Sequence, residues 1–411
     1  MQFATFACYK PKKNEDSMRI GMLLDNDFRS DPRVFNEAKA LCKGGNEVHI
    51  FCFSFGNLQL DQQIEGIFIH RFLLKKFIKD ALFILMNFIP FYTWLWYYIG
   101  SKAVKKYQIE ALHAHDLYMS GAAMLIKRKF GIPLTLDLHE NFPAAIKSYK
   151  WIHKFPHRFF VQVNQWEIKE NNLLSNADSI IVLSQHYAAY LKNNYPNLAQ
   201  KNFVVYPNVP DVKQLTDFDS AKGVEELSDG FWLFYFGGIS ERRGVFLVLD
   251  ALKTELSAFQ NIRLLLVGPV DKAEKQRFES VLNDQSLKDR VIYFPWRNIS
   301  ELPSLINASA VCLSPIEKNP QHDSGIANKV FQYMLFAKPL LVSNSTPQSE
   351  LVSEAGCGLI FESGNTKDFA EKVLELYKNQ YLAEIGEKGK KVILSTYNLE
   401  NFGKEINKIY A

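Results

Sequence analysis

Glycines followed by basic side chains occur in the second half of the chain, directly after an apolar run. The run Phe231–Phe236 predicts a buried strand, and Gly237, Gly238, Arg242 and Arg243 follow it at the start of a helical pattern. Glycine lets backbone N–H groups approach a phosphate, a helix N-terminus favours negative charge, and arginine can donate two hydrogen bonds to phosphate oxygens. The pattern therefore predicts an anion site; the alternative is an ordinary glycine turn with solvated arginines.

A second polar loop follows the predicted strand at 310–313. It leads into a helical pattern that carries Lys329 in its first turns and Gln332 three residues later on the same face. A lysine at a helix start suits an anion, and a neutral amide can hold ribose or sugar hydroxyls. The alternative is a surface helix whose lysine and glutamine are only solvated.

Acid and base side chains cluster at two predicted strand ends in the first half. His113, His115 and Asp116 belong to one strand end, and His139 and Glu140 follow the next predicted strand. In open α/β sheets, ligands bind beyond the carboxyl ends of the strands, so these side chains are expected to line a site. The alternative is a buried structural His–Asp pair.

Asp25, Asn26 and Asp27 have the spacing of a metal-binding DxD motif. They follow the first strand rather than one in the middle of a domain, so we interpret them as a loop and helix start near Arg29 and Arg33. The remaining sequence offers no convincing set of metal ligands, and the basic side chains supply the charge that a metal would otherwise provide. We therefore predict that the protein needs no metal or other cofactor.

Strands that alternate with helical stretches must position these loops. Such a pattern predicts parallel sheets covered on both faces, and it pauses once, over a linker-like stretch at 207–229. We expect strands at 19–24, 47–53, 111–113, 134–138, 179–183 and 203–206, and again at 231–236, 263–267, 291–294, 310–313 and 339–342. The predicted parts are a disordered extension at 1–17, a first domain at 18–210, a second at 211–394, and a C-terminal helix, about 395–411, that packs back on the first domain.

Composition places the chain among ordinary globular proteins, with 47% hydrophobic and 22% charged residues in 411. A net charge of +4 is too small to indicate nucleic acid, although it suits anionic small molecules or an anionic membrane surface. The five cysteines form no CxxC pair. A disulfide framework or zinc site is therefore not expected, a reducing cytosol fits best, and no segment resembles a signal peptide.

The segment 77–99 is almost wholly apolar and interrupts the alternation of strands and helices. Its length is near the roughly 20 residues that a membrane span needs. A span would place parts of one sheet on opposite sides of a membrane, so two other interpretations are favoured: a buried helix pair, or a helical hairpin on a membrane surface. Lys75, Lys76 and Lys79 flank the start of the segment, which is rich in Trp and Tyr, and a second aromatic and basic patch lies at 151–160.

Taken in order, these motifs resemble the family-4 glycosyltransferases of the GT-B fold, over nearly the whole chain from Met18. The resemblance is carried by Ala177–Ser184, Tyr206–Asn208, Gly237–Gly244, Gly268–Pro269, Asn328–Met334 and Lys338–Pro339. It implies two Rossmann-like domains whose parallel sheets face each other across a cleft. It also implies a nucleotide sugar in the second domain, an acceptor on the first, and transfer of the sugar with retention of anomeric configuration.

The sequence departs from the family pattern at the start of the helix that contains Lys329. Family members commonly have two Glu residues with seven between them, and the matching positions here are Ser324 and Gln332. The usual Arg of the glycine loop matches Gly238, so that only the family's Lys has a basic counterpart, Arg243. The chain thus resembles a divergent branch, and catalysis can survive because the main demand is to neutralise the departing diphosphate.

The site assignments follow from the motifs and the resemblance together. His139 matches a histidine of the first domain that in the family touches the sugar near the reaction centre, and it forms the candidate catalytic set with Glu140 and His115. The candidate donor-binding residues are Gly237, Gly238, Arg242, Arg243, Gly268, Ser314, His322, Ser324, Gly325, Asn328, Lys329 and Gln332.

The sequence therefore predicts a transferase that moves a sugar from a nucleotide sugar to a saccharide or lipid-linked acceptor. We expect it in cell-surface polysaccharide or glycolipid synthesis, on the inner face of the cytoplasmic membrane. Two other classes stay open. A sugar-nucleotide epimerase or hydrolase of similar shape would need carboxylates that move protons at the sugar. A binding protein that lost the chemistry would account for the missing Glu pair.

Overall fold

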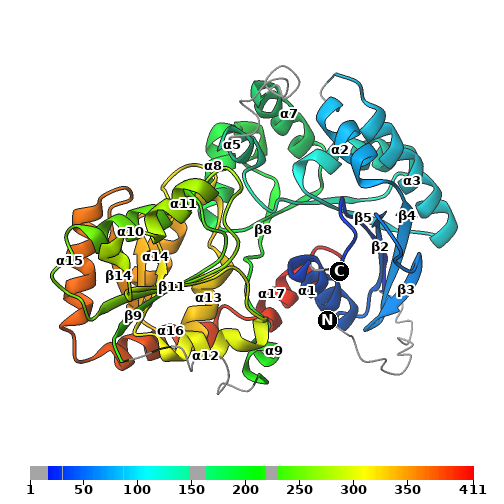
Figure 1. Ribbon diagram of the computed structural model, residues 1–411. Helices are drawn as coiled ribbons and strands as arrows, with labels where there is room; N and C mark the ends of the chain where they lie inside the picture. The colour runs from blue at the N-terminus through cyan, green and yellow to red at the C-terminus, as the bar shows by residue number, and fades with distance from the viewer. Residues whose placement is uncertain (1–16, 30, 87, 149–162, 219–226, 228) are drawn as a thin grey trace. The chain divides into compact units, whose positions relative to one another are not determined.

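The computed structural model describes residues 17–29, 31–86, 88–148, 163–218, 227 and 229–411. The chain forms two compact units, one of residues 1–207 with 400–411 and one of residues 208–399 (Figure 1). Each unit contains one sheet, and each is described below by itself. The predicted extension at 1–17 lies outside the described residues except for Ser17. The patch at 151–160 lies entirely outside them.

The first unit is built on an eight-stranded sheet with the order β3-β4-β2-β1-β5-β6-β7-β8. All neighbouring strands are parallel except the pair β3 and β4 at one edge. The strands are β1 (Arg19–Leu23), β2 (Glu47–Ser54), β3 (Asp61–Ile64), β4 (Ile67–Leu73), β5 (Ala111–His115), β6 (Leu134–Asp137), β7 (Ser179–Val182) and β8 (Asn202–Val205). Because β1, β5 and β6 are parallel neighbours, the residues that follow them meet at one edge.

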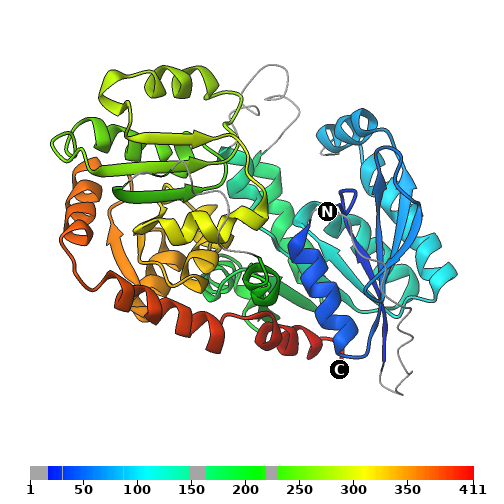
Figure 2. The same cartoon turned by 60° about the horizontal axis from the view of Figure 1, so that its bottom comes forward.

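Helices cover both faces of this sheet. The α-helices are α1 (Pro32–Lys43), α2 (Lys76–Leu85), α3 (Phe91–Tyr107), α4 (Ser120–Phe130), α5 (Phe142–Ser148), α7 (Val163–Ser175), α8 (Gln185–Asn194) and α17 (Leu399–Asn407). On one face, α1 and α17 pack side by side against residues such as Ile20 and Ile50; on the other, α3 and α4 pack against Leu23 and Phe51 (Figure 2). Each strand contributes to both faces because successive side chains along a strand point to opposite sides of the sheet.

The second unit is built on a six-stranded parallel sheet with the order β11-β10-β9-β12-β13-β14. The strands are β9 (Phe231–Phe236), β10 (Ile262–Val267), β11 (Val291–Phe294), β12 (Val311–Ser314), β13 (Leu340–Ser343) and β14 (Gly358–Phe361). The α-helices are α9 (Val212–Thr216), α10 (Val245–Lys253), α11 (Lys275–Leu282), α12 (Leu302–Ala308), α13 (Asn328–Leu335), α14 (Thr346–Ala355), α15 (Thr366–Tyr377) and α16 (Leu382–Ser395).

The predicted strands are all present, with ends that differ by at most two residues. Three further strands were not predicted. Of these, β3 and β4 form an antiparallel hairpin whose turn is Glu65–Gly66, where both residues have positive φ of 48° and 88°. A turn with positive φ favours glycine at one of its positions. Gly66, followed by alternating apolar residues at 67–73, was therefore the sequence signal that could have predicted this hairpin. The linker-like stretch at 207–229 contains the short helix α9.

The apolar segment at 77–99 forms parts of two helices that differ in burial. Among the described residues, no helix is long and apolar enough to cross a membrane. The α3 helix buries Tyr92, Trp96 and Ile99 in the first core, whereas no residue of α2, all ten of which are described, is buried. The first part of the segment thus belongs to the partly exposed helix α2, and the last part belongs to α3, which contributes to the core.

Candidate functional site

Two glycines at neighbouring strand ends bring two loops into close contact at one edge of the second sheet. Gly237 follows β9 with φ 135°, and Gly268 follows β10 with φ 141°. A Cβ atom on Gly268 would lie 2.1 Å from the carbonyl oxygen of Gly237, so the two loops touch and only glycine fits. By contrast, a Cβ atom on Gly238 would meet open space.

Lys329 is a buried lysine without a hydrogen-bond acceptor in the described part of the chain. It lies in the first turn of α13 and is only 7% exposed. Its Nζ atom is 3.7 Å from the ring centroid of Tyr235 and would be 3.3 Å from a Cβ atom on Gly237. Burial, and then the charge of Arg243, lower its pKa well below the usual value. A buried ammonium group is costly unless it is paired, so this lysine indicates an anionic ligand.

Other basic side chains surround this lysine. Arg242 and Arg243 form the short 3-10 helix η4 (Glu241–Arg243), and their charges lower the pKa of His322 in addition to burial, to about 4. His322 is therefore neutral at pH 7, with its Nδ1 atom 2.6 Å from the Glu317 carbonyl oxygen and its Nε2 atom buried without a partner among the described residues. Gly244, which directly follows Arg243, has φ 71° and lies against Pro315. The glycine loop and the loop after β12 thus form one cationic edge.

The remaining predicted donor residues differ in what their side chains do. The Ser314 hydroxyl is fully buried and donates to Gln348 at 2.8 Å, and the Ser324 hydroxyl donates to the Gln321 carbonyl at 2.7 Å, so both are used inside the unit. Gly325 is extended and precedes α13, which begins at Asn328 without a side-chain cap. Gln332 lies one turn further along the helix and is half-buried.

His139 lies between two carboxylates at a strand edge of the first unit. Its Nε2 atom is 2.8 Å from Asp137, and its Nδ1 atom is 3.7 Å from Asp116. Burial alone would lower its pKa, but the charges of Asp116 and Asp137 outweigh this and raise it to about 10. His139 is therefore an imidazolium at pH 7, which can donate hydrogen bonds and cannot accept a proton. Its side chain is 20% exposed, and neighbouring Glu140 is half-buried.

The backbone beside His139 is held in an unusual conformation. Asp116, directly after β5, has φ 69°, which costs free energy for a residue other than glycine. Its carboxylate accepts a hydrogen bond from the Tyr118 hydroxyl at 2.8 Å. Strain of this kind is kept where the surrounding structure fixes it, and it often marks a ligand site.

A buried ion-pair network that the sequence did not suggest supports these strand ends. Arg33 of α1 donates to both carboxylate oxygens of Asp137 at 2.5 and 3.0 Å and lies 3.1 Å from Glu37. Burial would raise the pKa of Asp137, but Arg33 and His139 hold it well below its usual range. His115 is fully buried, with its Nδ1 atom 3.2 Å from Asp137. In the sequence, the signal was the spacing of Arg33 and Glu37, which puts two charged residues on an otherwise apolar face of α1.

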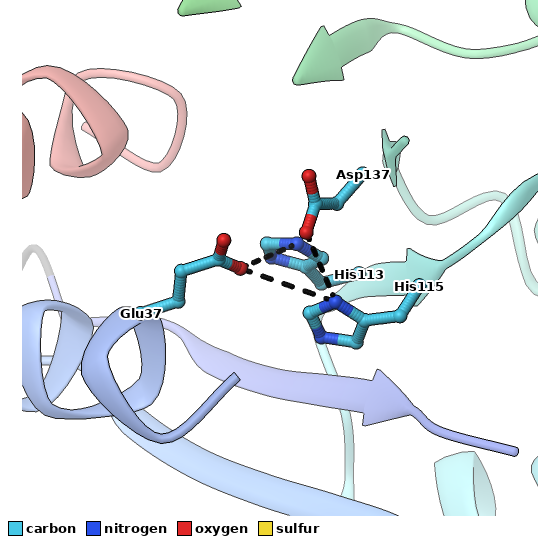
Figure 3. Close-up of side chains that lie close together, drawn as sticks. All are labelled: Glu37, His113, His115 and Asp137. Carbon is cyan, nitrogen blue, oxygen red and sulfur yellow. Dashed lines mark hydrogen bonds and ion pairs between the residues drawn. The ribbon is translucent and has the colours of Figure 1, made fainter. Parts of the chain in front are cut away.

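Four side chains of this network have the types and spacing of metal ligands (Figure 3). One ligand atom each of Glu37, His113, His115 and Asp137 lie within 4.8 Å of one another. Arg33, however, already pairs with Asp137 at this place and lies beside Glu37. Burial raises the pKa of Glu37, and its carboxyl lies 3.5 Å from His113 Nε2, so a protonated Glu37 fits the site without a metal. The prediction that no metal is required therefore stands as a prediction.

The DxD-like aspartates also have protein partners. Asp25 accepts a hydrogen bond from Tyr92 and lies 2.9 Å from Lys79, and Asp27 pairs with Arg29 at 2.6 Å. Burial raises the pKa of Asp25 to about 6 despite the lowering effect of Lys79. The interpretation of this motif as a loop and helix start agrees with α1, whose N-cap is Asp31.

Two parallel-sheet α/β domains with glycine loops and basic side chains at the strand ends define the class of glycosyltransferases with the GT-B fold. A model of glycosyltransferase family 4 matches residues 33–214, and a model of glycosyl transferases group 1 matches residues 217–392. Together these models span most of the chain, and the chain belongs to this family of glycosyltransferases. The resemblance expected from the motifs is thus confirmed, and so is the fold class.

Similar proteins agree with this assignment. An uncharacterized glycosyltransferase of Methanocaldococcus jannaschii is 24% identical over 76% of this chain and 78% of its own length. The Staphylococcus aureus capsular polysaccharide biosynthesis glycosyltransferase CapM is 25% identical over 45% of this chain and 47% of its own length.

Among solved structures, sucrose-phosphate synthase from Thermosynechococcus elongatus has a TM-score of 0.76 at 17% identity, and the match covers 96% of this chain and 98% of that one. Anabaena HepE in complex with UDP has a TM-score of 0.70 at 16% identity, over 95% and 99% of the two chains. These two structures share the fold of this chain.

Proposed function

We propose that this glycosyltransferase takes a nucleotide sugar in its second domain and transfers the sugar with retention to a saccharide or lipid-linked acceptor. The observation that carries the proposal is Lys329, a buried lysine without a hydrogen-bond acceptor among the described residues, beside two glycine loops and Arg243. In the reaction, the bond between the anomeric carbon and the diphosphate breaks, and negative charge collects on the departing oxygen. Lys329 and Arg243 would neutralise that charge. The complex of HepE with UDP supports a nucleotide as the leaving group.

A thermal-shift screen tests the proposal. UDP, GDP and CDP, each with and without a linked sugar, are added to the full chain. At a concentration about 100 times the Kd, a ligand of the native state adds about 2.7 kcal/mol of stability, so one nucleotide class should raise the Tm. Release of that nucleotide from its sugar derivative, dependent on a polyprenyl-linked saccharide, would then identify transfer. No shift with any nucleotide would overturn the proposal.

We further propose that His139, with Glu140 and His115, forms the acceptor side of the site. The imidazolium of His139 can donate a hydrogen bond to a sugar hydroxyl, while the buried His115 positions it through the 3.1 Å contact between their rings. We expect His139→Ala to lower kcat by about 10- to 100-fold, the range for one lost hydrogen bond to a charged group, and to leave nucleotide affinity nearly unchanged. Steady-state kinetics and nucleotide titration check both values. An equal loss of nucleotide affinity would instead assign His139 to the donor.

We propose that transfer requires no divalent metal, because the basic residues around Lys329 supply the positive charge. Treatment with EDTA should leave turnover within about twofold, since no metal–oxygen interaction is lost from the transition state. Elemental analysis of protein purified without chelators should find less than one metal ion per ten chains in the cluster of Glu37, His113, His115 and Asp137. Activity lost with EDTA and restored by Mg²⁺ or Mn²⁺ would contradict metal-independent transfer. Stoichiometric Zn²⁺ in the purified protein would contradict the expected lack of metal in the cluster.

We also propose that the first domain binds the inner face of the cytoplasmic membrane and that the enzyme acts in polysaccharide or glycolipid synthesis. The similarity to CapM supports only the role in polysaccharide synthesis. Large apolar side chains are exposed on α2, on α3 and on the turn between them: Phe77, Phe88, Ile89, Phe91, Trp94 and Tyr98. Lys75 and Lys76 are exposed beside them, whereas Lys79 is engaged by Asp25 and is not available for lipid. Aromatic rings favour the headgroup region, and each lysine near an anionic surface adds about 1 kcal/mol.

Vesicle flotation measures this membrane binding. The chain should float with anionic vesicles at low salt and bind neutral vesicles weakly. The double variant Lys75→Glu and Lys76→Glu should weaken anionic binding by at least about tenfold through loss and reversal of charge. The control Lys272→Glu and Lys275→Glu changes the same charge on exposed positions of the second unit and should have no effect. If the unmodified chain ignores anionic vesicles at low salt, the membrane part of the proposal is wrong.

A further inference from the structure

A cavity of about 280 Å³ lies in the first unit between the turn from α2 to α3 and the helices α4 and α7. Met86, Phe88 and Pro90 line it from the turn, and Trp166 and Leu173 line it from α7. The wall is thus mainly apolar, with polar groups from Thr93, Lys169 and Asn172. Its volume is at the lower end of the range for ligand pockets, which suits one segment of an extended chain rather than a whole cofactor.

One wall of the cavity is directly connected to the acceptor residues. Tyr118 lines the cavity and donates its hydroxyl hydrogen bond to Asp116 at 2.8 Å. Asp116 in turn lies 3.7 Å from His139. Tyr118 and Asp116 thus link the wall of the cavity to the histidine that we assign to the acceptor sugar.

Another part of the wall is continuous with the exposed apolar surface of α2 and α3. Phe88 and Pro90 belong both to the cavity wall and to the exposed turn. Lys169, whose Nζ atom lies 5.4 Å from the Trp166 ring centroid, adds a positive charge to the wall. An apolar cavity with a cation on its wall is complementary to an amphiphile that joins a hydrocarbon chain to a phosphate.

We propose that this cavity holds the chain-proximal part of a lipid-linked acceptor: its hydrocarbon next to Trp166 and Phe88, its phosphate near Lys169, and its first sugar toward His139. The inference rests on the proposed glycosyltransferase function and narrows the acceptor class from any saccharide to a saccharide on a phosphorylated lipid. It also gives the exposed turn between α2 and α3 a role in drawing that lipid out of the membrane surface.

Gly121 offers a way to fill the cavity from its wall. It lies in α4 and lines the cavity, and a Cβ atom there would meet only Thr93, at an ordinary contact distance of 3.5 Å. Gly121→Leu should therefore project its side chain into the cavity, and Gly121→Ala is the matched control that adds a methyl group and leaves most of the space open.

The experiment measures direct binding of decyl phosphate and butyl phosphate to the full chain by calorimetry, below the concentration at which decyl phosphate forms micelles. The unmodified chain and Gly121→Ala should bind decyl phosphate at least about tenfold more tightly than butyl phosphate, because more methylene groups are buried. Gly121→Leu should remove that difference. Lys169→Glu should weaken decyl phosphate binding and leave binding of decyl glucoside, which has no phosphate, unchanged.

Equal binding of decyl phosphate by Gly121→Leu and the unmodified chain would overturn the proposal, because the probe would then sit elsewhere on the apolar surface. If Gly121→Leu does not fold, as judged by circular dichroism, the pair of Lys169→Glu measurements decides. The nucleotide-induced Tm shift is recorded for every variant. If the nucleotide-induced Tm shift persists while the decyl phosphate test fails, the lipid-binding role of the cavity is wrong and the glycosyltransferase proposal stands.

Discussion

Replacing Lys329 with alanine should reduce turnover by about 30- to 1,000-fold, which corresponds to about 2–4 kcal/mol of lost transition-state stabilisation. The reason is the burial of its ammonium group at the glycine loops, where the low dielectric strengthens its interaction with a departing diphosphate. Arg243→Ala should cause a loss in the same range. Turnover within about threefold of the unmodified enzyme for both variants would remove these residues from the donor site.

The matched control for this prediction is Lys338→Ala. Lys338 is a partly buried lysine in the same unit, but its Nζ atom already donates to the Asn307 carbonyl at 2.8 Å. Its replacement should leave turnover nearly unchanged. A further variant tests stability: Lys329→Met replaces a buried amine that has no hydrogen-bond acceptor among the described residues with an apolar side chain, so it should raise the Tm of the ligand-free chain by about 2–4 °C for each 1 kcal/mol gained. The same variant should lose the nucleotide-induced Tm shift.

The second large effect concerns stability. Arg33→Met should lower the free energy of unfolding by about 3–5 kcal/mol, because it removes the buried guanidinium that pairs with Asp137 and lies beside Glu37. Denaturant titration measures the change. Arg29→Met is the control: Arg29 also pairs with an aspartate, Asp27, but is 65% exposed, so its loss should cost at most about 1 kcal/mol.

A destabilisation by Arg33→Met no larger than that of Arg29→Met would mean that the network contributes little. In that case, protonation of Glu37 would be sufficient to relieve the repulsion between the two carboxyls. The double variant Arg33→Met with Asp137→Asn distinguishes these accounts, because it removes the cation together with its main partner. If the network matters, the double variant should be more stable than Arg33→Met alone.

The sequence allowed the fold and the strand ends to be predicted because both depend on local patterns. Apolar runs set the strands, and the glycines after β9 and β10 follow from the positive φ that their close approach requires. Lys329 could be placed in the first turn of a helix that follows a strand in the same way, because this prediction uses only the residues around it. These features belong to segments of about ten residues, which periodicity can resolve.

Contacts between distant segments were not predictable in the same way. Arg33 binds Asp137 across 104 positions, and Ser314 binds Gln348 across 34, so nothing near either residue in the sequence indicates its partner. For this reason Ser314 was expected at the donor, whereas its hydroxyl is used inside the second unit. Lys79 was grouped with Lys75 and Lys76 for the same reason, because its ion pair with Asp25 depends on how α2 folds back on β1.

The packing of α17 on α1 has a consequence for the order in which the protein is made. Asn407 donates to the Ala40 carbonyl at 2.9 Å, Gly403 approaches Ala40 closely, and the Tyr410 hydroxyl lies 2.9 Å from His113 Nδ1. The first unit is thus finished by residues that leave the ribosome only after the entire second unit. Until then, Ile406 and Tyr410 are missing from the core and part of α1 is uncovered. The two units therefore cannot mature strictly one after the other during translation, and the earlier one must wait, incomplete, for the later one.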